Sequence, residues 1–282
     1  MSIHIFTDST ADLNPVVRNK VSVIPLNIRF GDDEFIDGVT ITTAQFYEKL
    51  LKSDLLPTTS QAAPYDFEDA FRSAVSSGDT VIVITLSSKL SGTYQSACIA
   101  AAEFPGKVFV VDSLSVAIGS AILVQYALEL AQNGLDAETI VRKLTQKREK
   151  IRLIALLDTL EYLKKGGRIS SAAALAGSLL NIKPLICIEN GEIKMLGKAR
   201  GNKQGNQMMI QTVEKSGGID FTKPLMLGYT GLDTAMLEKF TADAADLWAD
   251  HMQVPPSTVV GSVVGTHAGP GAVAIAFFSA GA

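Results

Sequence analysis

The fold class is decided by one stretch, Thr80-Val81-Ile82-Val83-Ile84-Thr85-Leu86, whose middle is continuously apolar. A strand without polar alternation is covered on both faces, which is typical of a parallel sheet packed between helices. Similar apolar runs lie on either side of it, at Ile3 to Thr7 and at Val108 to Val111, and helical patterns separate the three runs. Repeated strand and helix units of this kind predict an α/β fold with a doubly wound parallel sheet.

The segments between these strands are predicted from their local patterns. Apolar residues three and four positions apart predict a helix from Pro64 to Ser76. Residues 117–132 are apolar almost all round, which predicts a buried helix. The run Val21 to Leu26 predicts another strand, and its Pro25 favours the edge of the sheet. We expect Thr58-Thr59-Ser60-Gln61 to be a loop.

The pattern changes after Lys150, where we place a domain boundary. Residues 1–150 are expected to form the doubly wound domain, and residues 151–282 a mixed α/β domain. Two strand patterns on either side of Asn190-Gly191 predict a β-hairpin. Other elements of this half are predicted as strands at 225–229, 258–262 and 273–278, and as helices at 159–165, 170–180, 204–215 and 234–251.

Composition excludes several classes of protein. The chain has 282 residues, of which 47% are hydrophobic, so it is not a disordered protein. Its 25 basic and 29 acidic residues give a net charge of −4 without a long basic run, so we expect no nucleic-acid partner. No apolar run is long enough for a membrane span, and the N-terminus lacks a signal-peptide pattern. Two isolated cysteines, Cys98 and Cys187, indicate a cytoplasmic protein without a structural metal.

Hydroxyl side chains follow the ends of the predicted parallel strands. They occur at Ser9 and Thr10, from Ser87 to Thr93, and from Ser113 to Ser115. The carboxyl ends of parallel strands meet at one edge of a sheet, where ligands bind. Hydroxyls beside helix N-termini suit a carboxylate or a phosphate. Helix capping is the better explanation of each segment alone, but together they predict a polar, anion-binding pocket.

Two charged or titratable residues also suit a binding site. His267 lies in Gly265 to Gly271, where three glycines and a proline predict a tightly shaped backbone. Arg168 follows Gly166-Gly167, and its guanidinium suits an anion, although a solvated basic turn explains it equally well. The spacing of Gly269 and Gly271 matches a dinucleotide fingerprint by letter only, because no helix is predicted after it.

Seven motifs occur in a fixed order along the chain. They are Thr7-Asp8-Ser9-Thr10, Ile24-Pro25-Leu26, Thr59-Ser60-Gln61, Leu90-Ser91-Gly92-Thr93-Tyr94, Leu160-Glu161-Tyr162-Leu163 running into Gly166-Gly167-Arg168-Ile169, Leu180-Asn181-Ile182-Lys183-Pro184, and His267-Ala268-Gly269-Pro270-Gly271. In this order they resemble the DegV family of bacterial fatty-acid-binding proteins. The resemblance extends from about Ile3 to Phe278. One departure is Ala62, which stands where the family often has proline.

The resemblance implies that a long acyl chain is buried between two α/β domains, without a cofactor and without enzymatic activity. It implies a fatty-acid-binding subunit that presents the carboxylate to an ATP-dependent fatty acid kinase subunit, so that the acyl phosphate enters phospholipid synthesis. The family's carboxylate-binding hydroxyls match Thr59 and Ser91, with Ser60, Gly92, Thr93 and Ser9 nearby. Its polar residues near the acyl phosphate match His267 and Arg168, and its kinase-docking residue matches Arg200. Residues 172–180 supply small and apolar side chains for an acyl lining.

Two alternatives stay open at this point. The first is a serine hydrolase or esterase that uses Ser91 with His267 and an acid such as Asp8, although no Gly-x-Ser-x-Gly elbow is present. The second is a phosphosugar-binding protein, because hydroxyls at strand ends also suit phosphate. The chain has no dedicated phosphate loop, which places this alternative last.

Overall fold

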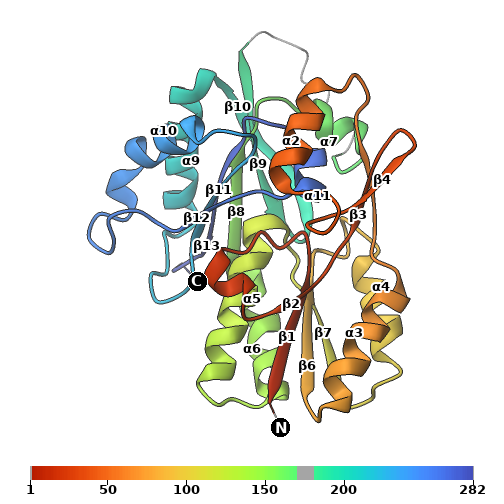
Figure 1. Cartoon of the computed structure of the whole chain (residues 1–282). Coiled ribbons are helices and arrows are strands. Elements are labelled where there is room, and N and C mark those ends of the chain that lie inside the picture. Colours follow the sequence, from red (N-terminus) through yellow and green to blue (C-terminus); the bar gives the residue numbers. More distant parts are fainter. Residues whose placement is uncertain (1, 170–180, 282) are drawn as a thin grey trace.

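The structure is a computed structural model that describes residues 2–169 and 181–281. Three β-sheets and the helices around them make up the fold (Figure 1). The predicted helix at 170–180 lies outside the described residues, and so does the acyl lining expected at 172–180.

The first sheet is parallel, with the strand order β2-β1-β6-β7. Its strands are β1 (Ile3–Asp8), β2 (Ser22–Ile24), β6 (Thr80–Thr85) and β7 (Val108–Asp112). Ile82 and Ile84 of β6 pack with helices α5 (Ala117–Gln132) and α6 (Ala137–Lys147) on one face. Val81 and Val83 pack with α3 (Pro64–Ser76) and α4 (Thr93–Ala101) on the other face. The predicted doubly wound α/β fold is confirmed, because the apolar strand is buried on both faces.

A small antiparallel sheet was not predicted. Its order is β4-β3-β5, formed by Asp33–Ile36 (β4), Asn27–Phe30 (β3) and Thr58–Ser60 (β5). The strand expected from Val21 to Leu26 is wrong in its extent, because β2 ends at Ile24. Pro25 has no N–H to donate to a neighbouring strand, and β3, which belongs to another sheet, begins at Asn27. The loop expected at Thr58–Ser60 is wrong, because these polar residues pair with β3. Helix α2 (Thr43–Lys52) packs its buried aromatic residues against this sheet.

The third sheet is mixed, with the order β10-β9-β8-β13-β11-β12. Its strands are β8 (Ile151–Leu156), β9 (Ile182–Glu189), β10 (Glu192–Arg200), β11 (Met226–Tyr229), β12 (Ser257–Val259) and β13 (Val273–Phe278). The predicted hairpin of β9 and β10 is confirmed, and both turn residues, Asn190 and Gly191, have the positive φ that this turn requires. Helices α9 (Gly201–Lys215) and α10 (Ala235–Asp243) cover the outer face. The helix expected at 234–251 is too long, because α10 ends at Asp243.

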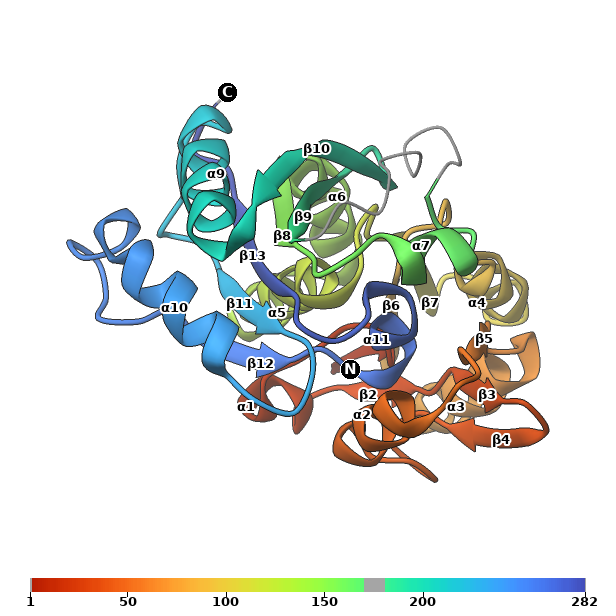
Figure 2. The same ribbon diagram turned by 90° about the horizontal axis from the view of Figure 1, so that it is seen from above.

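Helix α5 lies between the parallel and the mixed sheet (Figure 2). It contacts β1 and β6 on one side and β8, β11 and β13 on the other. Its residues are buried on almost every side, which confirms the predicted buried helix. All described strands of the parallel sheet end by Asp112, and those of the mixed sheet begin at Ile151. The division into domains 1–150 and 151–282 stays a prediction.

Helix α11 (Ser262–Ala268) belongs to the second half of the sequence but packs on the first half. It contacts α2, β3 and β5, as well as α7 (Glu161–Lys165). The tightly shaped backbone expected from Gly265 onward begins later, because Gly265 is part of helix α11. Gly265 is packed closely against Tyr47, whose hydroxyl lies 2.6 Å from the position that a Cβ on Gly265 would take. Of the three glycines in this stretch, only Gly269 and Gly271 have positive φ. This helix brings His267 from near the C-terminus to the small sheet of the first half.

Candidate ligand-binding site

A cavity lies between the parallel and the mixed sheet and measures about 940 Å³, including its open mouth. Much of its wall comes from the mixed sheet, which contributes Leu153, Ala155, Ile186, Ile188, Ile193 and Ala274. Val116 and Ala117, where α5 begins, also line it. A mostly apolar cavity with a small number of polar groups is typical of a site for a small apolar ligand.

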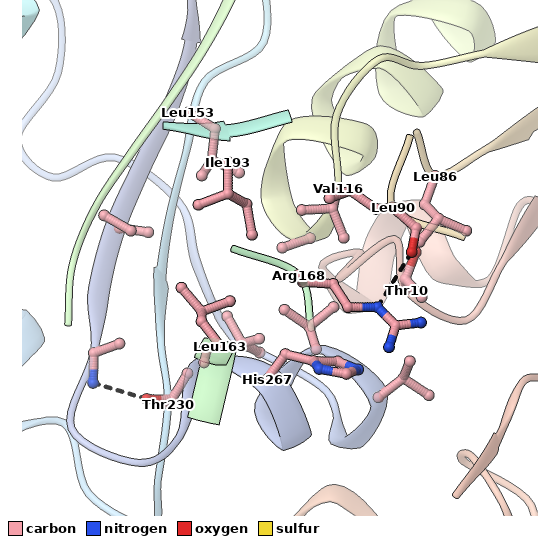
Figure 3. A pocket seen from close by; sticks show the side chains of 18 of the residues that line it. Thr10, Leu86, Leu90, Val116, Leu153, Leu163, Arg168, Ile193, Thr230 and His267 are labelled. Atoms are coloured by element: carbon pink, nitrogen blue, oxygen red, sulfur yellow. Dashed lines mark hydrogen bonds between the residues drawn. The ribbon is translucent and has the colours of Figure 1, made fainter. Parts of the chain in front are cut away.

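One group of polar side chains in the cavity comes from four segments. Figure 3 shows Arg168 beside Leu90 and His267 next to Arg168, both away from Leu153 and Ile193. The other polar residues of this group are Thr59, Ser60 and Gln61, at and after β5, and Ser91, before α4. The cavity therefore has an apolar part against the mixed sheet and a part where hydroxyls, an imidazole and a guanidinium meet.

Thr59 and His267 contact each other directly. The Thr59 hydroxyl oxygen lies 2.9 Å from His267 Nε2, because β5 and α11 are in contact. Burial, and secondarily the Arg168 charge, lowers the pKa of His267 to about 4, so the ring is neutral at pH 7. Its Nδ1 is buried without a partner among the described residues. A buried N–H without an acceptor is costly, so the ring proton belongs on Nε2, which donates to Thr59 and leaves the Thr59 O–H free to donate.

Ser91 is positioned at the start of α4. Its hydroxyl accepts from the Thr93 backbone N–H at 3.3 Å and lies 3.0 Å from the Thr93 hydroxyl. Gly92 lies directly against Gln61, because a Cβ at this position would overlap the Gln61 amide. Gln61 in turn donates to the Ser96 hydroxyl at 3.0 Å. This close approach joins the end of β5 to the start of α4, which places Thr59 and Ser91 in the same cavity.

Arg168 enters the cavity through the turn that ends α7. Gly166 caps this helix and Gly167 has a φ of 69°, so the predicted helix end is confirmed. The guanidinium donates from Nη1 to the Gly166 carbonyl at 2.6 Å and from Nε to the Leu90 carbonyl at 3.3 Å. Arg168 is therefore half-buried against the cavity, and the turn is not simply a solvated one.

Several predicted site residues do not line the cavity. Ser9 accepts from the Leu26 backbone N–H at 3.1 Å, while Thr93 is buried beside Ser91. Gly92 lies against the Gln61 side chain, which does line the cavity. Arg200 is exposed at the end of β10, where α9 begins. Thus the structure brings together Thr59, Ser60, Ser91, Arg168 and His267, and the roles of all nine residues stay predictions.

The hydroxyls expected at the sheet edge mostly bond to backbone groups. The Ser87 hydroxyl donates to the Gly191 carbonyl at 2.7 Å, and the Ser113 hydroxyl donates to the Ser115 carbonyl at 3.1 Å. Thr10 is an exception, because it lines the cavity although its hydroxyl donates to Asp8 at 2.5 Å. Capping and turn formation therefore explain most of these strand-end hydroxyls.

Other lining residues were missed by the sequence analysis. Tyr229 and Thr230 lie at the end of β11, and Thr230 accepts from the Ala272 backbone N–H at 2.8 Å. Thr230 could have been predicted from the sequence, because its hydroxyl directly follows a predicted strand. The apolar lining of the mixed sheet carried no such signal, because an apolar side chain that faces a cavity has the same pattern as one that faces the core.

The hydrolase alternative requires a chain of hydrogen bonds from serine to histidine to an acid. His267 pairs through Nε2 with Thr59 rather than with Ser91, and its Nδ1 has no partner in the described residues. Asp8 accepts from the Leu86 backbone N–H at 2.7 Å and from Thr10. A histidine pKa of about 4 is also far below that of a general base acting near neutral pH. The described residues therefore do not form the arrangement that this alternative needs.

Residues 2–169 and 181–281 contain neither a metal-binding cluster nor a membrane-spanning helix. No group of three or more His, Cys, Asp or Glu side chains in this part of the chain is arranged to hold a metal ion. No helix in the same described ranges has both the length and the apolar character to cross a bilayer.

The fold and the site thus define an α/β protein with a largely apolar cavity that also holds a cluster of hydroxyl, imidazole and guanidinium groups. The chain matches the family model of the DegV family, described as uncharacterised proteins, over residues 2–280. It therefore belongs to the DegV family.

Relatives and solved structures resemble the chain over nearly its whole length. A DegV domain-containing protein from Caldanaerobacter subterraneus subsp. tengcongensis is 35% identical over 280 residues, 98% of each chain. A structure described as a fatty-acid-binding DegV family protein from Thermus thermophilus has 32% identity and a TM-score of 0.88, covering 99% of this chain and all of the other. The Streptococcus pneumoniae fatty acid kinase B3 protein, loaded with linoleic acid, shares the fold at 24% identity and a TM-score of 0.86, covering 99% of both chains.

Proposed function

We propose that this protein binds a long-chain fatty acid, with the carboxylate at Thr59 and Ser91 and the acyl chain along the mixed sheet. The observation that carries this proposal is the joining of an apolar wall and a hydroxyl, imidazole and guanidinium cluster in one cavity. The fatty acid described for the Thermus thermophilus structure supports it.

The acyl chain and the carboxylate are expected to contribute different amounts of binding free energy. Each buried methylene contributes about 0.8 kcal/mol, so a chain of roughly sixteen carbons supplies on the order of 10 kcal/mol. A hydrogen bond to a charged group contributes about 1.5–3 kcal/mol, and the Thr59 O–H freed by His267 is such a donor. Arg168 adds a positive charge beside the carboxylate. The acyl chain thus supplies most of the affinity, and the polar groups select the orientation.

The proposal extends to a kinase partner. The bound carboxylate would be presented to an ATP-dependent fatty acid kinase subunit in the cytoplasm, and the acyl phosphate would enter phospholipid synthesis. The ordered motifs and the name of the Streptococcus pneumoniae protein of the same fold support this step. Arg200 is exposed and is the proposed docking residue. The protein itself acts as a carrier without a cofactor.

The ligand is tested by extracting the purified protein with organic solvent and measuring the extract by mass spectrometry. A long-chain fatty acid is the expected result. Absence of a fatty acid, together with no binding of added palmitate, would show that the proposal is wrong.

The carboxylate site is tested by the double variant Thr59→Val with Ser91→Ala. It should weaken palmitate binding by about tenfold or more, since each lost hydrogen bond to a charge is worth over 1 kcal/mol. The matched control is Thr58→Ala with Ser88→Ala, because these two neighbours are exposed and do not line the cavity. Equal affinities of the two double variants would count against the assigned site.

Docking is tested by reconstitution with a fatty acid kinase subunit and ATP. Arg200→Ala should slow acyl phosphate formation while palmitate affinity stays unchanged. Lys203→Ala, on the exposed side of α9, is the control. Full activity of Arg200→Ala would remove Arg200 from the docking surface.

A further inference from the structure

The turn that carries Ser91 is organised by Ser87. The Ser87 carbonyl accepts from the backbone N–H groups of Leu90 at 3.0 Å and Ser91 at 3.3 Å. Its hydroxyl accepts from the Lys89 backbone N–H at 3.2 Å. Ser87 is fully buried, yet it is not among the described residues that line the cavity. It therefore sets the position of Ser91 without being available to a ligand.

The same hydroxyl reaches a strand turn in the other half of the chain. Ser87 donates to the Gly191 carbonyl at 2.7 Å, across 104 positions of sequence. Gly191 has a φ of 83°, and a Cβ there would overlap the Ser87 hydroxyl and lie 3.2 Å from Lys89 Cγ. The tip of the β9–β10 hairpin thus rests directly on the Ser87–Ser91 turn, with no space between them. A shift of the hairpin tip has to move this turn.

The hairpin also forms a wall of the apolar part of the cavity. Ile188 and Ile193 form the second residue pair from the Asn190-Gly191 turn, and both line the cavity. Ile193 is seen in Figure 3 on the side away from His267. The same hairpin therefore contacts the acyl part of the cavity with its paired isoleucines and the Ser91 turn with its tip.

The Ser91 turn has a second support. Arg168 donates to the Leu90 carbonyl at 3.3 Å, next to Ser91 (Figure 3). Arg168 and Gly191 both belong to the second half of the chain, whereas the turn belongs to the first. The carboxylate end of the cavity is thus held from the mixed-sheet side at two points, and only the Gly191 contact leads back to the acyl wall.

We propose that the Ser87–Gly191 contact couples the two ends of the cavity. An acyl chain long enough to pack on Ile188 and Ile193 holds the hairpin tip against Ser87, and Ser87 then fixes Ser91 in its binding position. A shorter chain leaves the isoleucines uncovered and the turn less fixed. Ser87 is a positioning residue in this scheme, which rests on the proposed function.

The coupling is measured with a double-mutant cycle at two chain lengths. In the native protein, Ser91→Ala should weaken palmitate binding by about threefold more than it weakens decanoate binding, since contacting groups share such interaction energies. In the Ser87→Ala background this difference should disappear. Ser88→Ala, the exposed neighbour, is the control background and should keep it. An equal Ser91→Ala penalty at both chain lengths in the native protein would overturn the proposal, as would a difference that persists in Ser87→Ala.

A second measurement needs no ligand. Gly191→Ala should raise hydrogen exchange at the Leu90 and Ser91 amides, because its Cβ displaces the hairpin tip from Ser87. Gly78→Ala is the matched control, since Gly78 has a φ of 89° and no atom within 4 Å of its Cβ position. Exchange at Leu90 and Ser91 that is the same in both variants would overturn the proposal.

The two proposals fail in different ways. Native protein that binds neither palmitate nor decanoate overturns the fatty-acid function and the coupling with it. Native protein that binds both acids, with a Ser91→Ala penalty independent of chain length, overturns the coupling alone.

Discussion

Asp12 and Gly261 are joined across 249 positions of sequence by a hydrogen bond of 2.6 Å, which the Gly261 backbone N–H donates to the Asp12 carboxylate. Gly261 immediately precedes α11, the helix that carries His267. The other carboxylate oxygen of Asp12 is buried without a partner in the described residues. Burial, with the neighbouring charges of Asp37 and Asp8, raises the pKa of Asp12 well above its ordinary value. The position of α11 thus depends on a carboxyl group that is costly to ionise.

Asp12→Asn is expected to stabilise the protein at neutral and alkaline pH. A carboxyl whose folded-state pKa is raised contributes fully below its unfolded-state pKa of about 3.9, and that contribution is lost as the pH rises through the folded-state pKa. Asparagine keeps the acceptor for Gly261 but does not ionise, so the free energy of unfolding at pH 8 should rise by about 1 kcal/mol. Urea denaturation at pH 5, 7 and 8 measures this.

Asp12→Ala is the contrasting variant. It leaves the Gly261 N–H without its acceptor and should lower the free energy of unfolding by about 1–3 kcal/mol. If Asp12→Asn were as destabilising as Asp12→Ala at pH 8, the ionised carboxylate would be stabilising, contrary to this prediction.

His267 should titrate with a pKa of about 4 in the ligand-free protein. Because its folded-state pKa is lowered, its stabilising contribution is present above the unfolded-state value of about 6.5 and is lost as the pH falls toward 4. Ring resonances followed by NMR measure the pKa, and His267→Gln assigns the signal. Addition of palmitate should raise the pKa, since a carboxylate favours the imidazolium. No change on saturation would place the carboxylate away from His267.

Two neighbouring glycine variants distinguish two effects: Gly166→Ala disturbs the contact with His267, and Gly167→Ala strains only the backbone. A Cβ at Gly166 would overlap His267 Nδ1, whereas a Cβ at Gly167 meets no atom within 4 Å, although its φ is 69°. Gly166→Ala should therefore displace the imidazole from Thr59 and weaken palmitate binding by about tenfold. Gly167→Ala should lower stability by about 1 kcal/mol and leave the affinity unchanged. Calorimetric titration and thermal unfolding of both variants test this, and equal affinities would contradict it.

Ala155 should limit the length of the bound chain. It pairs with Ala274 across β8 and β13, and both line the cavity. The series Ala155→Val and Ala155→Leu fills this part of the cavity with increasing volume. We expect the bound fatty acid to become shorter by about one carbon for each carbon added to the side chain, as the displaced methylenes lose their burial. Mass spectrometry of extracted ligands measures the change, and an identical chain-length distribution across the series would exclude this wall from acyl contact.

Sequence patterns predicted the elements whose signals are local. The run from Thr80 to Leu86 indicates its own burial, and Asn190-Gly191 specifies its turn. Strand β5 was missed because Thr58–Ser60 is polar and becomes a strand only by pairing with β3. Likewise, the Thr59 to His267 contact spans 208 positions and arises from the packing of α11, which no local pattern encodes. The cavity wall was missed because apolar strand residues have the same pattern whether they face a ligand or a core.

Helix α5 has a consequence for how the cavity opens. It is packed against both large sheets, and Ile118 lies 3.1 Å from where a Cβ on Gly228 of β11 would be. If the sheets moved apart, α5 would lose its contacts with one of them, and a close-packed apolar face of the helix would be exposed to water. The two sheets therefore cannot separate without losing this packing. We therefore expect a ligand to enter and leave while both sheets stay packed on α5.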